Sequence, residues 1–159
     1  MFNPLEKDGS IKIKNYPFLG ELYSFTDRLK GIGRGSIKIH YKSGIAEFDK
    51  LNQLNVDTAF VNFEPTTKGI ILRFNKTNRI RAFGLAYASI HQIEIERILI
   101  KTSRFKKSIF GQNRKGATKG KLFIKGDFNT IMLEIPVHQV EKIVAFLSKL
   151  PICDKLLIV

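Results

Sequence analysis

Residues 130–150 read TIMLEIPVHQVEKIVAFLSKL, and two hydrophobic patterns follow one another in this stretch. Residues 130–135 have the apolar character of a strand. After Pro136, apolar side chains recur at helical spacing, at Val140, Ile143, Val144 and Leu147. Proline is well tolerated at the start of a helix, because the N–H that it lacks would have no partner there. The stretch therefore predicts a strand and then an amphipathic helix over residues 137–149, packed through this apolar stripe and ended by Pro151.

The chain before this stretch predicts a succession of further strands. Residues 36–42 alternate between apolar and polar side chains, which is typical of a half-buried strand. β-branched and aromatic residues bounded by turn residues predict strands at 58–63, 70–74, 79–83, 90–100 and 122–124. With residues 130–135 these make about seven strands. Residues 45–56 stay unassigned.

The length of 159 residues fits one domain with a single core. We divide it into an N-terminal extension of uncertain structure (1–35), the strands and the final helix (36–150), and an apolar tail (151–159). The single cysteine, Cys153, excludes an internal disulfide, and we expect a buried, inert thiol in a reducing compartment. The sequence has no secretory signal and no apolar run long enough to span a bilayer. We therefore predict a cytoplasmic protein, with a peripheral place at the membrane as one option.

Three stretches resemble the pleckstrin-homology-like family, including its bacterial and GRAM-like members. They are GIILRF at 69–74, LAYASIHQIEI at 85–95, and the strand pair at 122–124 and 131–133 with the helix at 136–150. The resemblance implies a mainly β (α+β) fold: a bent, antiparallel, partly closed β-barrel of about seven strands, capped by one C-terminal amphipathic helix. It also implies a scaffold that binds lipids, peptides or its own copies and seldom catalyses a reaction.

The chain is strongly basic, and its charge is unevenly distributed. There are 27 Lys and Arg against 14 Asp and Glu, a formal net charge of +13. Residues 28–46, 65–93 and 97–126 contain no acid at all. Concentrated positive charge attracts polyanions, so we expect an anionic ligand, an anionic membrane surface or a nucleic acid as the partner.

The hairpin at 68–81 is the first candidate site. Lys68, Arg79 and Arg81 match the Lys…Arg-x-Arg spacing of phosphoinositide-binding members of the family that the chain resembles. We predict a register with Arg73 opposite Arg79, because it keeps the core face of the hairpin apolar. In that register Arg73, Arg79 and Arg81 form one outward cluster for an anion. Removing Arg79 and Arg81 should then weaken membrane binding more than removing Lys142 and Lys149.

Two alternatives remain open at this point. Residues 105–120 predict a long exposed loop, and cations across 104–121 surround Phe105 and Phe110 as in proteins that bind RNA or DNA by stacking. The nucleic-acid candidates are Arg104, Lys106, Lys107, Arg114, Lys115 and Lys119. The second alternative is a structural module that forms a homo-oligomer through its apolar tail.

The sequence carries no catalytic constellation. Gly31, Gly33 and Gly35 lack the strand–loop–helix context of a phosphate loop, so we interpret them as a flexible hairpin turn. The three histidines are dispersed, and a single cysteine cannot complete a zinc site. We therefore predict no catalytic residue, no metal and no cofactor. The sequence favours a non-enzymatic binding module for anionic ligands or membrane surfaces.

Overall fold

The structure is a computed structural model, and it describes residues 2–3, 11–31, 33, 35–53, 59–76, 79–100 and 117–159. The strands are β1 (Phe2–Asn3), β2 (Ile39–Ser43), β3 (Phe60–Pro65), β4 (Gly69–Lys76), β5 (Arg79–Ala86), β6 (Ile90–Ile100), β7 (Ala117–Gly126), β8 (Ile131–Ile135) and β9 (Leu156–Ile158). The α-helices are α1 (Phe25–Leu29), α2 (Ala46–Gln53) and α3 (Val140–Leu147). Short 3-10 turns are η1 (Ile13–Asn15), η2 (Pro17–Leu19), η3 (Tyr87–Ser89) and η4 (Cys153–Lys155).

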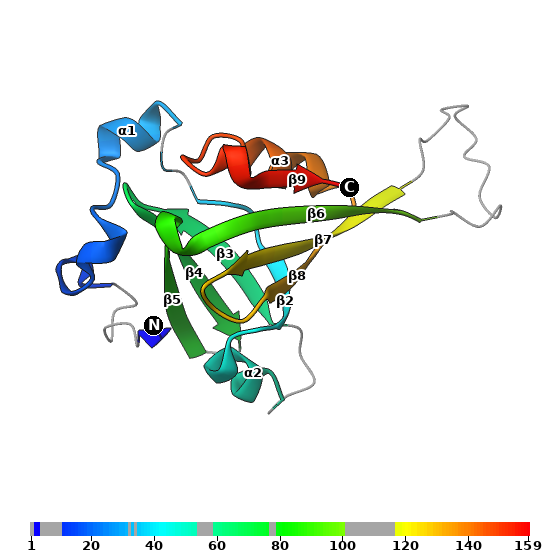
Figure 1. Ribbon diagram of the computed structural model, residues 1–159, viewed down its shortest axis with the longest axis horizontal. Coiled ribbons are helices and arrows are strands. Elements are labelled where there is room, and N and C mark those ends of the chain that lie inside the picture. Colours follow the sequence, from blue (N-terminus) through cyan, green and yellow to red (C-terminus); the bar gives the residue numbers. More distant parts are fainter. Residues whose placement is uncertain are drawn as a thin grey trace.

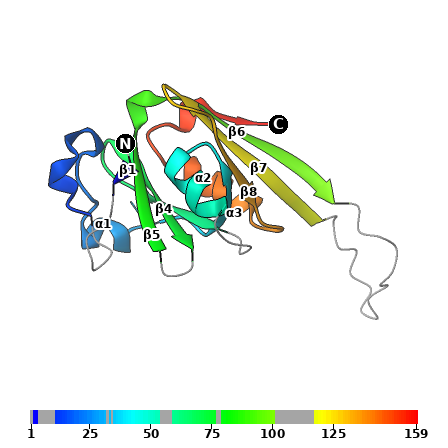
Figure 2. The same ribbon diagram turned by 90° about the horizontal axis from the view of Figure 1, so that it is seen from below.

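The architecture is mainly β, as the sequence predicts. The nine strands formed by the described residues make one open sheet in the order β1-β5-β4-β3-β2-β8-β7-β6-β9. All neighbours are antiparallel except β6 and β9, which run parallel. The sheet is strongly bent, so that β3, β4 and β5 form one side and β6, β7 and β8 the other (Figures 1 and 2). Each predicted strand overlaps one of β2 to β8, although the strands predicted at 36–42, 58–63 and 130–135 begin one to three residues too early.

The core fills the space inside the bend. It is built from alternate residues of β2 to β8, which present buried aliphatic and aromatic side chains to one another. Figure 1 places α2 and α3 at opposite ends of this space. Phe48 on α2 is fully buried, and its ring packs against Tyr41 and Phe74 with centroid separations of 5.5 and 4.4 Å. The helix in the unassigned segment 45–56 therefore closes one end of the core.

The last helix packs as predicted but is shorter. Val140, Ile143 and Leu147 are buried, and Val144 packs against the same core. The helix begins at Val140, not at residue 137, so Pro136 does not occupy its first turn. His138 has a φ of 64°, a left-handed conformation that no α-helix can contain, and it turns the chain before the helix starts.

The N-terminal segment, residues 11–31, packs on the outer face of β4 and β5. Leu19 in η2 is buried there against Ile71 and Ala82, with Ile11, Ile13 and Tyr16 around them. The backbone anchors the segment as well, since Lys68 N–H donates to Leu19 O at 3.0 Å and Thr67 N–H donates to Glu21 O at 2.9 Å. The hairpin β4–β5 is therefore buried on both faces.

The register of this hairpin differs from the predicted one. Arg73 pairs with Ala82, while Arg79 pairs with Lys76. Arg81 pairs with Phe74, so side-chain alternation puts Arg81 on the core side of the sheet and Arg73 on the outer side. The predicted outward cluster of Arg73, Arg79 and Arg81 is wrong. It assumed that only one face of the hairpin is buried, whereas Ile71 and Ala82 bury the second face under Leu19.

The apolar tail joins the sheet. Leu156, Leu157 and Ile158 pair with residues 93–95 of β6 as strand β9. Just before it, Lys155 Nζ donates to the carbonyl oxygens of Tyr87 and Ile90 at 3.1 and 2.6 Å. Cys153 is exposed, which corrects the expectation of a buried thiol. The chain turns outward at η4 before it pairs with β6.

The predicted long loop is only partly described. Residues 117–120 belong to β7, because this strand pairs with β6 as far as Ala117 opposite Ile100. The predicted loop therefore ends earlier than residue 120, and residues 105–116 lie outside the described residues. None of the helices in the described part of the chain is long and apolar enough to span a membrane.

We expect Phe48→Ala to lower the free energy of unfolding by about 3–5 kcal/mol, because it leaves a cavity between Tyr41 and Phe74 that the sheet cannot collapse to fill. Phe25→Ala is the matched control, since Phe25 is 75% exposed, and it should change stability by less than about 0.5 kcal/mol. Urea unfolding followed by circular dichroism measures both. Equal losses would show that α2 does not close the core.

A second substitution tests the N-terminal segment. Leu19→Ala should cost about 2–4 kcal/mol, a core-sized loss, because Leu19 seals the outer face of β4 and β5. Leu22→Ala, at a partly exposed leucine of the same segment, is the control and should cost less than about 1 kcal/mol. A loss for Leu19→Ala no larger than that for Leu22→Ala would contradict the burial of this second face.

Candidate functional site

The hairpin residues predicted to bind an anion are not gathered into one site. Lys68 is exposed in the turn before β4, while Arg73 and Arg81 lie on opposite faces of the hairpin. The Arg79 side chain lies outside the described part of the structure. The described geometry therefore gives no common surface for Lys68, Arg73 and Arg81.

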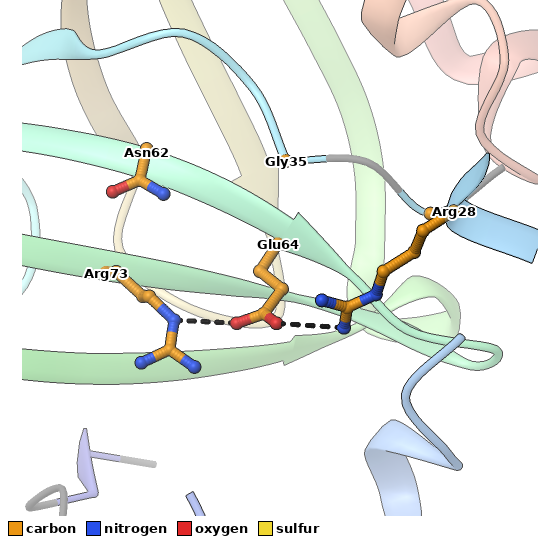
Figure 3. Close-up of a pocket in the computed structure, with 6 residues that line it drawn as sticks. Arg28, Gly35, Asn62, Glu64 and Arg73 are labelled. Atoms are coloured by element: carbon orange, nitrogen blue, oxygen red, sulfur yellow. Dashed lines mark hydrogen bonds and ion pairs between the residues drawn. The ribbon is translucent and has the colours of Figure 1, made fainter. Parts of the chain in front are cut away.

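Arg73 instead belongs to an ion-pair cluster with Glu64 and Arg28. Its Nε lies 2.6 Å from Glu64 Oε2, and Arg28 Nη2 lies 3.2 Å from Glu64 Oε1 (Figure 3). Glu64 comes from β3, Arg73 from the adjacent strand and Arg28 from α1. The cluster, with Asn62, lines an open pocket of about 400 Å³. The Glu64 carboxylate lies between the two guanidinium groups and so connects α1 to the sheet. It also neutralises part of the positive charge of Arg28 and Arg73.

Of the six nucleic-acid candidates, Lys119 alone is described. It lies in β7, 3.8 Å from Glu134, which also pairs with Lys42 at 2.9 Å. The hydrogen bond from Lys42, more than the nearby charge of Lys119, lowers the pKa of Glu134. Further pairs on the same sheet are Lys121 with Glu96 and Lys125 with Glu94. The nucleic-acid interface stays a prediction, since the other five candidates lie outside the described residues.

The glycine-rich stretch separates two pockets and is not a hairpin turn, which corrects our interpretation. Gly31 and Gly33 have φ values of 86° and 69°. A Cβ at Gly33 would lie 2.3 Å from the ring of Tyr23, so only glycine fits. Gly33 and Gly35 line the pocket of Arg28 and Arg73 on one side and a larger groove on the other.

We call this larger hollow the α1–α3 groove. It has a volume of about 510 Å³ and runs between the segment around α1 and the helix α3, which lie next to each other in Figure 1. Its apolar lining comes from both sides and consists of Tyr23, Pro65, Ala145, Phe146 and Leu150. Backbone of the glycine stretch completes the wall. The groove thus has a surface against which an apolar group can pack.

Three lysines surround this apolar lining. Lys30 follows α1, Lys142 lies on α3 and Lys149 follows it, and all three are exposed. The lining includes no acid from the described residues, and none of the three lysines has an ion pair with a described carboxylate. The lysines on β7 discussed above, by contrast, all face a glutamate. The groove is therefore one place where three described lysines lie together without an ion pair to a described carboxylate.

A buried hydroxyl lies close to the groove wall. Tyr87 in η3 is 7% exposed, and its hydroxyl has no hydrogen-bond partner. Burial raises the pKa of this hydroxyl, and the neighbouring Tyr23 raises it further. Tyr23 itself lines the groove. An unpaired buried hydroxyl is costly, but Tyr87 is not among the residues that line the groove.

Comparison with known proteins adds no relative: the chain matches no protein-family model, no curated protein and no solved structure. The candidate site therefore rests on geometry alone.

The sequence analysis did not find the groove. From the sequence, Lys142 and Lys149 served only as the comparison for substitutions of Arg79 and Arg81. Lys30 was considered only as part of the acid-free stretch 28–46. One signal was available: two lysines seven residues apart, flanking Phe146, share one side of a predicted helix. The contribution of residues 23–35 to the same wall requires the tertiary structure.

Glu64→Gln should lower the free energy of unfolding by about 1–2 kcal/mol, because it leaves two guanidinium groups facing a neutral amide. The control is Glu96→Gln: Glu96 is 45% exposed and lies 3.5 Å from Lys121, so its loss should be below about 0.5 kcal/mol. Chemical unfolding at low and high salt measures both. A loss for Glu64→Gln no larger than for Glu96→Gln would contradict a structural role for the cluster.

Proposed function

We propose that the protein is a non-enzymatic binding module on a pleckstrin-homology-like scaffold, and that it binds an anionic amphiphile in the α1–α3 groove. The scaffold part is supported by the order of the elements: seven strands, β2 to β8, bend around one core, β2 pairs with β8, and α3 follows directly. This order of a bent open sheet followed by a helix supports the proposed scaffold. The fold alone does not select the ligand.

The observation that carries the proposal is the pairing of charge and apolar surface in the groove. Lys30, Lys142 and Lys149 supply three ammonium groups without an internal partner, and Phe146 and Tyr23 supply aromatic surface between them. A purely ionic ligand would gain nothing from the aromatic lining, and a purely apolar one nothing from the lysines. An anionic head group joined to an apolar chain satisfies both.

A non-catalytic role is supported by the chemistry of the described residues. Burial, together with the hydrogen bond to Asp49, accounts for the raised pKa of Tyr41, which lies in the core. The exposed pair of His91 and Asp127 lies at the start of β6 and just after β7, and neither residue lines the groove. The groove itself offers lysines, aromatic rings and backbone, which suit binding better than bond making.

The test is titration with a short single-chain phosphate amphiphile below its critical micelle concentration, followed by calorimetry. Lys142→Gln with Lys149→Gln should weaken binding about tenfold or more, because each lysine near an anionic group contributes roughly 1 kcal/mol. The zwitterionic choline ester of the same chain length should bind more weakly than the phosphate amphiphile.

The matched control removes the same charge elsewhere. Lys121→Gln with Lys125→Gln lowers the net charge equally, but these lysines face Glu96 and Glu94 on the sheet. We expect less than about a twofold change in affinity, since only long-range attraction is altered. Equal losses for the two double variants would mean diffuse attraction, and the groove would be abandoned as the site.

A further inference from the structure

Helix α1 exposes large apolar side chains beside the groove. Phe25 and Leu29, one helical turn apart on the same side of α1, are 75% and 61% exposed. Phe18 and Leu22, just before the helix, are partly exposed as well. Single exposed apolar residues are ordinary, but four large ones within twelve residues concentrate exposed apolar surface in this segment.

The structure holds α1 in place despite its length of five residues. Ser24 and Asp27 form a capping box, in which Asp27 N–H donates to Ser24 Oγ and Ser24 N–H donates to Asp27 Oδ2. Arg28 anchors the other side, donating to Tyr23 O and to Glu64. These bonds present Phe25 and Leu29 outward from a preformed helix, so little conformational entropy has to be lost when they meet a partner.

The charges around α1 favour an anionic partner. Lys30 follows Leu29 directly, and Lys142 and Lys149 face it across the groove. Asp27 is occupied by the capping box, which leaves Glu21 as the exposed acid of the described segment 11–31. Apolar side chains next to a group of lysines are the combination that binds anionic bilayers: the apolar groups enter the interface and the ammonium groups meet the lipid phosphates.

We infer that α1 is a membrane-inserting helix, and that the anionic amphiphile of the groove is presented by the surface of an anionic lipid bilayer. This inference rests on the proposed function. Phe25 and Leu29 enter the interfacial layer, while Lys30, Lys142 and Lys149 contact head groups. Two weak contributions, apolar insertion and charge attraction, together give reversible binding, as is usual for peripheral proteins.

The chain offers a clean reporter for the test, because it contains no tryptophan. Phe25→Trp introduces a single indole at the insertion point. Leu99→Trp is the matched control, since Leu99 is also 75% exposed but lies near the end of β6, remote from α1 (Figure 1). Each variant is mixed with vesicles of phosphatidylglycerol and phosphatidylcholine, and with vesicles of phosphatidylcholine alone.

For Phe25→Trp we expect emission to move to shorter wavelength with the anionic vesicles only, and lipids brominated in the acyl chain should quench it. Leu99→Trp should show neither effect. Unchanged Phe25→Trp emission, or an equal response of both variants, overturns the inference. A shift that grows with protein concentration without vesicles also overturns it, because a second copy of the chain would then cover α1.

A pair of substitutions measures the strength of insertion. Phe25→Ser with Leu29→Ser should reduce the partition coefficient onto anionic vesicles by at least about tenfold, which corresponds to about 1.4 kcal/mol. The same variant should still bind the short phosphate amphiphile, because the groove lysines are unchanged. If the double variant binds the amphiphile and still partitions onto anionic vesicles like the wild-type protein, membrane insertion by α1 is refuted and the groove is not. If the wild-type protein itself does not bind the short phosphate amphiphile, the proposed function is refuted.

Discussion

The contact of Leu19 with the outer face of β4 and β5 is the constraint on which the rest of the N-terminal segment depends. A Cβ at Gly84 would lie 2.8 Å from Leu19 Cδ1, and a Cβ at Gly69 would lie 2.7 Å from Leu19 Cδ2. The two glycines therefore make the space that the leucine fills. Because the outer face is buried, the hairpin needs apolar side chains on both of its faces. The segment that carries Leu19 is held against the outer face of the sheet. The position of α1 and of the groove wall follows from that.

The same contact decides what the basic residues can do. Arg73 lies on the outer face next to the buried patch, where Glu64 compensates its charge and Arg28 shares the carboxylate. On the other half of the sheet, glutamates on β6 and β8 pair with the lysines of β7. Much of the positive charge on β7 is thus compensated, because strand register places each of these lysines opposite or diagonal to an acid. Net charge alone does not locate a binding surface.

In the α1–α3 groove, three lysines without an ion pair to a described carboxylate lie beside aromatic side chains. The lysines there come from the ends of two helices and not from paired strands, so no register sets an acid opposite them. Between them lie aromatic side chains and glycine backbone, whose left-handed conformation at Gly33 allows the chain to pass close to Tyr23. A surface of this kind is maintained at some cost in solvation, which an anionic amphiphilic partner would relieve.

The sequence by itself determined the mainly β class, the seven strands and the apolar stripe of α3, because the periods of two and of 3.6 residues are local properties of the chain. It also located the excess of positive charge. Only the tertiary structure decided the register of β4 and β5, since the burial of Ile71 and Ala82 depends on Leu19, which is distant from both in the chain. It likewise decided the late start of α3, after the left-handed His138, and which described lysines lack an ion pair. A site assembled from residues 23–35 and 142–150 has no local signature, because the chain brings these segments together only when the sheet between them has folded.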